Sequence, residues 1–237
     1  MEQQSFVPRE YTLADQAAAE ERGRFISRTY THLFCAITAL ILLEAALLST
    51  PLAENMIGLM ASAGNLSWLI VLGGFMAASY VANKWAQDST SVGMQYAGLS
   101  LYVVAQAIIL LPLLYIAAET GGASVIPTAG IVTLCAFTGL TAVVVITRKN
   151  FSFLGPFLGV AGLAAFGFIV CSIIFGFSLG ILFTVLMIVF ACGYILYDTS
   201  KVMHEYRTDQ HVAASLALFA SVALLFWYVL RLFMSRR

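Results

Sequence analysis

The sequence contains few charged residues. Aspartate, glutamate, lysine and arginine make up 10% of the 237 residues, whereas about a quarter is usual for a soluble protein. Hydrophobic residues make up 61%, and the mean hydropathy is +0.91. A soluble fold of this length cannot bury so much apolar surface. The composition therefore argues against a soluble enzyme and indicates a protein that crosses the membrane several times.

Motifs for catalysis, metal binding and cofactor binding are also missing. The chain has no H-E-x-x-H zinc motif, no phosphate-binding P-loop and no strand-linked G-x-G-x-x-G, and its four cysteines form no C-x-x-C pair. His32 lies only at the edge of an apolar stretch, so a serine–histidine intramembrane protease is not indicated. Twelve basic residues balance twelve acidic ones, which does not favour nucleic acid as a partner. We expect neither enzymatic activity nor a cofactor.

Seven long apolar stretches dominate the chain. A transmembrane helix needs about 20 apolar residues, and the strands of a membrane β-barrel would alternate apolar and polar residues, which these stretches do not. Because lipid offers no hydrogen-bond partners to the backbone, the stretches must be helical. We predict an all-α polytopic membrane protein whose seven spans are Ser27–Leu48, Ser67–Ala82, Met94–Ala117, Ser124–Ile146, Phe153–Phe175, Leu179–Tyr197 and Val212–Met234.

The polar segment 1–26 lacks the order of a cleavable signal peptide, so we predict a cytosolic tail followed by a seven-helix domain over 27–237. With the N-terminus inside, the cytosolic segments hold nine lysines and arginines, and the opposite loops around 49–66, 118–123 and 176–178 hold none. The basic C-terminal end contradicts this pattern. Either the last segment crosses and leaves these charges outside, or it is re-entrant; we favour seven full spans.

Charged side chains inside the apolar stretches are costly, so each requires a partner or a function. Glu44 and Arg231 both lie near the outer ends of their spans. One hypothesis is that they form an ion pair, and the other is that each reaches the membrane surface separately. Asp198 closes the sixth span at its cytosolic end. It could bind a hard cation such as calcium, or it could be an interfacial acid paired with Lys201.

Two segments resemble a known family. Residues 147–158, TRKNFSFLGPFL, resemble the D-F-S-F-L-G-G-F-L start of the fifth helix of the Bax inhibitor family. Residues 193–200, GYILYDTS, resemble the Y-D-T end of its sixth helix. The order and spacing of the motifs match, and the short loops resemble the bacterial, YccA-like branch. This resemblance implies a location in the bacterial inner membrane and a bundle whose last helix is central and surrounded by the other six.

The resemblance also implies a candidate ion site. In better studied members, two aspartates that share one proton close a pH-dependent calcium leak, and their repulsion after deprotonation opens it. Asp198 matches the first aspartate, but Ser221 occupies the second position, and a serine donates a hydrogen bond without titrating. Our candidate ion- and pH-sensing residues are Asp198, Ser221, Glu44 and Arg231, and Asp198 is the candidate calcium ligand.

Two functions follow from the resemblance. YccA-like members lack the second acid and associate with FtsH, the membrane-embedded AAA protease of the bacterial inner membrane, as resistant substrates or modulators. Our first interpretation is such a modulator in membrane-protein quality control or stress, engaged through residues 1–26. The alternative is a leak for calcium ions or protons that uses Asp198, with Glu44 as a further candidate. The serine at position 221 favours the first interpretation.

Overall fold

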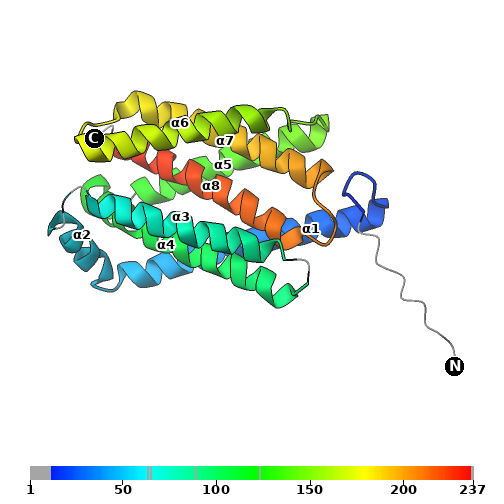
Figure 1. Cartoon of the computed structure of the whole chain (residues 1–237), viewed down its shortest axis with the longest axis horizontal. Helices are drawn as coiled ribbons and strands as arrows, with labels where there is room; N and C mark the ends of the chain where they lie inside the picture. The colour runs from blue at the N-terminus through cyan, green and yellow to red at the C-terminus, as the bar shows by residue number, and fades with distance from the viewer. Residues whose placement is uncertain (1–11, 63, 65, 89, 123, 236–237) are drawn as a thin grey trace.

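A computed structural model describes residues 12–235 apart from residues 63, 65, 89 and 123. These residues form one elongated bundle of helices (Figure 1). The all-α prediction is confirmed for this part of the chain, in which strand-like pairing is limited to one isolated β-bridge. The eight helices are α1 (Ala19–Leu48), α2 (Leu52–Ser62), α3 (Leu66–Ala86), α4 (Val92–Gly121), α5 (Val125–Thr147), α6 (Leu154–Phe175), α7 (Gly180–His204) and α8 (His211–Met234).

The number of helices that are long and apolar enough to cross a membrane differs, in the described part of the chain, from the prediction of seven. Six helices of the described chain are long and apolar enough to cross a bilayer, namely α1, α4, α5, α6, α7 and α8. The predicted second span lies in α3, whose 21 residues include polar Asn83 and Lys84 in the last turn. The apolar part of α3 is therefore shorter than the roughly 20 residues that a span requires. The segment 49–66, predicted as a loop, contains the short helix α2.

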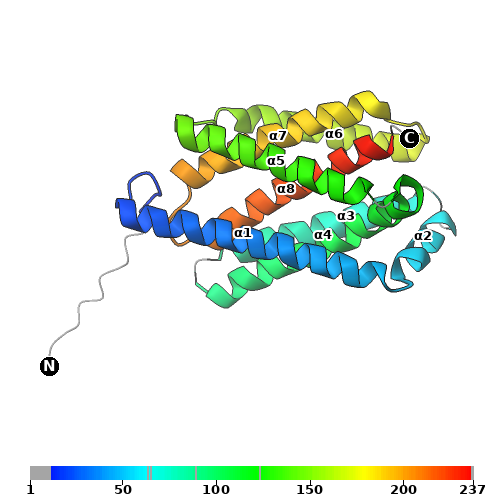
Figure 2. The same ribbon diagram turned by 180° about the vertical axis from the view of Figure 1, so that it is seen from behind.

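The last helix, α8, occupies the middle of the bundle (Figures 1 and 2). It packs against α1, α3, α4, α5 and α7, and most of its residues are buried. Its central position is as predicted from the resemblance, but the predicted arrangement of six helices around it differs for α6. That helix lies at the periphery, packs against α7 and α3, and buries only Leu158 among its described residues.

Small residues allow the helices to approach one another closely. On α8, Ala213, Ala214 and Ser215 are all buried, and such residues let neighbouring membrane helices pack at short range. The tightest glycine lies between α3 and α4. A Cβ atom on Gly98 would lie 2.5 Å from the carbonyl oxygen of Ala82, so this position has no room for a side chain.

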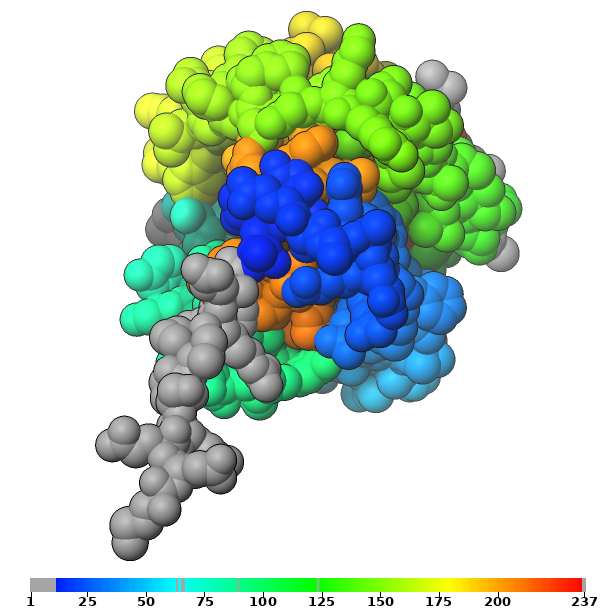
Figure 3. Space-filling model, turned by 90° about the vertical axis from the view of Figure 1, so that its right-hand side faces the viewer, coloured from blue at the N-terminus to red at the C-terminus, as the bar shows by residue number. Residues whose placement is uncertain are grey.

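The segment before α1 lies against the bundle. Residues 1–11 of the predicted tail are outside the described residues, whereas residues 19–26 already belong to α1. Leu13 forms an antiparallel bridge with Arg207, in the connection between α7 and α8. In the end-on view, the first described residues, in dark blue, cover the orange α7–α8 connection (Figure 3). Residues 12–18 are therefore a docked segment, which we call the N-terminal strap.

Candidate functional site

The structure brings together two of the four predicted site residues, Asp198 on α7 and Ser221 on α8. Asp198 is 8% exposed and Ser221 is 4% exposed. The Ser221 hydroxyl donates a hydrogen bond to Oδ2 of Asp198. The two helices run antiparallel in close contact, which places the seventh residue from the end of α7 opposite the middle of α8. The carboxylate is thus held by a neutral donor at the position where the resemblance placed a second acid.

Lys201, the other predicted partner of Asp198, contacts two aromatic rings and does not form an ion pair with Asp198. Its ammonium lies 5.3 Å from the ring centre of Tyr197 and 5.4 Å from that of Tyr206, and such cation–π contacts are attractive. The ion pairs among the described residues are Arg24–Glu20 and Arg207–Asp209, so the interfacial pair of Asp198 with Lys201 is not formed. Tyr206 lies just beyond the end of α7. Burial, and then the charge of Asp198, raise the pKa of Tyr206 above its usual range.

The two sequence motifs that carry the family resemblance meet at this end of the bundle. The backbone N–H of Phe151 donates to the hydroxyl of Ser200 at 2.8 Å, and that hydroxyl donates to the side-chain oxygen of Asn150 at 3.2 Å. The hydroxyl of Ser152 donates to the Glu205 carboxylate. The α5–α6 connection is therefore fastened to the last turns of α7, close to Asp198. Both motifs are recognisable in the sequence, but the contact between them is not.

Glu44 and Arg231 do not form the predicted ion pair. Glu44 is 5% exposed, and neither of its carboxylate oxygens has a hydrogen-bond partner. It belongs to the buried face of α1, together with Phe25, Leu33 and Leu40, and that face points into the bundle. The alternative, in which Glu44 reaches the membrane surface, does not hold either. Arg231 is half-buried on α8, so similar depth in the membrane does not bring the two side chains together.

A resident calcium ion does not fit the donors around Asp198. Calcium takes six to eight oxygen ligands, several of them from carboxylates. Asp198 is paired with a single hydroxyl, and the described residues include no cluster of three or more histidine, cysteine, aspartate or glutamate side chains. Within the described part of the chain, the Asp198 carboxylate therefore lies in the interior of the bundle without the ligand set of a calcium-binding site.

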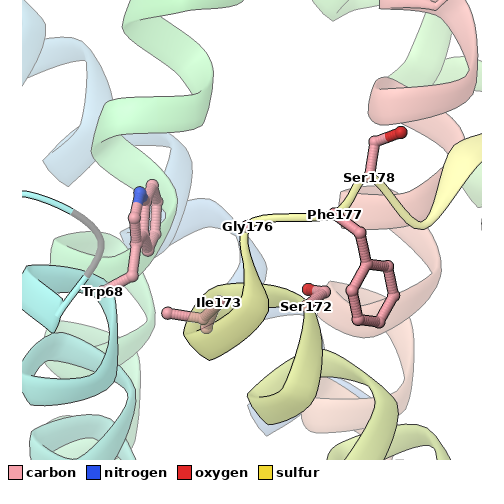
Figure 4. Close-up of a pocket in the computed structure, with 6 residues that line it drawn as sticks. All are labelled: Trp68, Ser172, Ile173, Gly176, Phe177 and Ser178. Carbon is pink, nitrogen blue, oxygen red and sulfur yellow. The ribbon is translucent and has the colours of Figure 1, made fainter.

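A shallow pocket lies at the opposite end of the bundle. Figure 4 shows Trp68 at the start of α3 facing Ile173 of α6, beside the turn that Gly176 makes with φ at 71°. Ser172, Phe177 and Ser178 complete the lining, which contains no titratable side chain. Because α7 begins beside this turn, Asp198 lies about 27 Å further along that helix. The pocket is thus separate from the Asp198–Ser221 contact and offers no group for acid–base chemistry.

The long apolar helices pack around a buried central helix, and their outer faces are largely exposed. This arrangement defines an α-helical multi-pass membrane protein. Comparison with known proteins gives the family. The family model described as "Inhibitor of apoptosis-promoting Bax1" matches residues 22–237, so the chain belongs to the Bax inhibitor family. This confirms the resemblance at the level of the family.

Several curated proteins are similar over part of their length. Uncharacterized protein PA2604 of Pseudomonas aeruginosa is 32% identical over 121 residues, which cover 51% of this chain and 54% of that protein. Protein LIFEGUARD 2 of Arabidopsis thaliana is 33% identical over 120 residues, which cover 41% of this chain and 50% of that protein. Protein lifeguard 4 of Mus musculus is 29% identical over 103 residues, which cover 43% of each chain. The chain spans about half the length of the curated relatives it matches.

Proposed function

We propose that this protein acts by binding, as a YccA-like modulator of a membrane-embedded AAA protease of the FtsH type in a bacterial inner membrane. The hydrogen bond between Ser221 and Asp198 is the observation that carries the proposal. One carboxylate cannot generate the like-charge repulsion that would open a two-aspartate gate. The site therefore holds two helices together and is poorly suited to switching, which fits a protein that works through its folded shape.

The proposed role also requires a bundle that resists extraction, because AAA proteases pull on their substrates. Contacts at the end that carries the N-terminal strap support this. The buried hydroxyl of Ser215 on α8 donates to the carbonyl oxygen of Thr29 on α1 at 2.8 Å, and Phe151 and Ser200 join the α5–α6 connection to α7. We propose that this end faces the cytosol and that residues 1–11 are the segment the protease engages.

The test is degradation of a model membrane protein by an FtsH-type protease in proteoliposomes, with increasing amounts of this protein. We expect degradation of the model substrate to slow several-fold while this chain persists. A variant without residues 1–11 should lose the effect and keep the unfolding temperature of the full chain. Unchanged degradation at saturating amounts would refute the proposal. Gly93→Ala serves as the matched control, because the structure leaves room for the added methyl group and both the N-terminal segment and the Asp198–Ser221 contact stay intact.

A second candidate is a leak for calcium ions or protons, and it is favoured by one observation. Asp198 places a carboxylate inside the bundle, 8% exposed, where an acid without a function would be costly. Calcium entry into proteoliposomes at acidic and at mildly alkaline pH tests this. A leak predicts flux that is abolished by Asp198→Asn and that becomes strongly pH-dependent in Ser221→Asp. Flux equal to that of empty vesicles at every pH would exclude it.

A further inference from the structure

The N-terminal strap binds the connection between α7 and α8 through its backbone. The N–H of Ala14 donates to the carbonyl oxygen of Tyr206 at 2.9 Å, and the N–H of Thr208 donates to the carbonyl oxygen of Thr12 at 3.3 Å. Between these bonds, Leu13 lies opposite Arg207. The side chain of Ala14 is fully buried, so the strap is packed against the bundle as well as hydrogen-bonded to it.

The strap binds the connection between α7 and α8, and these are the two helices that carry Asp198 and Ser221. Asp198 lies on α7 and Ser221 on α8, and residues 205–210 link these helices. Tyr206 forms part of this link. Its ring faces the ammonium of Lys201 at 5.4 Å, and its phenol lies close enough to Asp198 for that charge to act on it. The strap is therefore bound to the backbone of a residue whose ring faces Lys201 and whose phenol is affected by the charge of Asp198.

Among the described residues, few apolar side chains attach the strap to the bundle. Two backbone hydrogen bonds and the buried Ala14 attach it, and a third hydrogen bond, from Thr208 to Glu21, attaches the first turn of α1 to the same connection. Segments with few buried apolar contacts open at a lower free energy than the core of a protein. Ala14 is the one strap residue in the core of the described bundle, whereas α8 contributes many, among them Leu216, Leu218 and Phe219.

We propose that residues 12–18 are a releasable latch, which closes the α7–α8 connection over Asp198 and transmits capture of the preceding N-terminal segment to the Asp198–Ser221 contact. The step from capture to the site rests on the proposed function, in which a protease engages residues 1–11. The latch itself is a property of the isolated chain. Release of the strap frees Tyr206 and Thr208, which loosens the link between α7 and α8 and exposes their cytosolic ends to exchange with water.

The bridge geometry permits a direct test by disulfide locking. Because the hydrogen bonds flank Leu13 and Arg207, these two residues form a non-hydrogen-bonded antiparallel pair, whose Cα atoms lie about 4.5 Å apart in regular pairing. This spacing is within the range that a disulfide accepts, about 4.4–6.8 Å. Leu13→Cys with Arg207→Cys, in a chain whose native cysteines are replaced by alanine, should lock the latch on oxidation. Asp15→Cys with Arg207→Cys is the out-of-register control.

Hydrogen–deuterium exchange of the purified full chain in lipid nanodiscs gives the readout. Oxidation of the in-register pair should slow amide exchange several-fold over residues 195–211, relative to the reduced protein, and should leave α6 unchanged. Ala14→Pro, which removes the N–H bonded to Tyr206, should accelerate exchange over the same residues. Thr208→Val is a milder second variant that removes the bond to Glu21, so the test does not depend on Ala14→Pro folding.

Two outcomes would overturn the latch. One is equal exchange around Asp198 in the locked, reduced and released proteins. The other is a change limited to residues 205–210, since this would show a docked segment without coupling to the site. These measurements contain no protease. If locking the strap slows exchange around Asp198 but the protein does not slow an FtsH-type protease, the latch is supported and the proposed function is refuted. If the protein slows the protease but exchange around Asp198 does not respond to the strap, the proposed function is supported and the latch is refuted.

Discussion

The hydrogen bond between Ser221 and Asp198 leads to a quantitative prediction. Ser221→Ala removes one oxygen atom and leaves a small cavity, but it deprives a carboxylate that is 8% exposed of its protein partner. Hydrogen bonds to charged groups contribute about 1.5–3 kcal/mol, and those between membrane helices average about 0.6 kcal/mol with a maximum of about 1.7 kcal/mol. We therefore expect Ser221→Ala to lower the free energy of unfolding by about 1–3 kcal/mol.

A double-mutant cycle separates this bond from other effects of the substitutions. Ser221→Ala, Asp198→Ala and the double variant are unfolded in detergent micelles and followed by tryptophan fluorescence. We expect a coupling energy of about 1 kcal/mol or more. Independent sites add to within about 0.3–0.5 kcal/mol, so a coupling energy inside that range would refute the reasoning. Ser215→Ala combined with Asp198→Ala is the control, because the buried Ser215 hydroxyl bonds the carbonyl oxygens of other residues.

Three further predictions follow from the packing and the charges. Glu44→Gln replaces a buried carboxyl whose oxygens have no partner, so the unfolding temperature should rise; a fall would contradict the unpaired assignment. Gly98→Ala should destabilise the protein by about 1–3 kcal/mol through overpacking, whereas Gly93→Ala, whose nearest neighbour would lie 3.8 Å away, should have little effect on the unfolding midpoint. The raised pKa of Tyr206 stabilises the fold below the ordinary pKa of tyrosine, and this stability is lost as the pH rises through the raised value. Absorbance of tyrosinate in an alkaline titration measures this pKa, and the transition that Tyr206→Phe removes belongs to Tyr206. Asp198→Asn should lower the midpoint of that transition, because it removes a negative charge that raises the pKa.

Hydropathy predicted most of the helices because burial in lipid constrains long segments strongly. The predicted spans Met94–Ala117 and Phe153–Phe175 lie almost entirely within α4 and α6. The same criterion misjudged shorter elements. It gave no signal for α2, which is only 11 residues long, and it counted α3 as a span although the last turn of α3 contains the polar residues Asn83 and Lys84. A segment can form a helix without being long or apolar enough to cross a membrane, and α2 and α3 are both of this kind.

The sequence predicted which side chains of the site can donate or accept hydrogen bonds, because that depends on residue type. It did not predict which way each side chain points, because that depends on the rotation of each helix about its axis. Glu44 and Arg231 have similar depth in the sequence-based model of the spans, but depth does not fix the face on which a side chain lies. The available signal was a three- and four-residue spacing, which places Glu44 on the buried face of α1 with Phe25, Thr29, Leu33, Ala36 and Leu40. The N-terminal strap had no such signal, because Ala14 is held through its backbone and its small side chain.

The serine at position 221 changes what the end of the bundle can do. With two carboxylates, the number of bound protons decides whether the helices attract or repel each other. With Ser221 opposite Asp198, the hydroxyl can donate to the ionised acid or accept from the protonated one, so a hydrogen bond between α7 and α8 is possible in both protonation states. The remaining way to separate these helices is mechanical, through the connection they share. That connection is the one to which the N-terminal strap is bound, and it is for this reason that the proposed latch acts by movement of the strap and not by release of a proton.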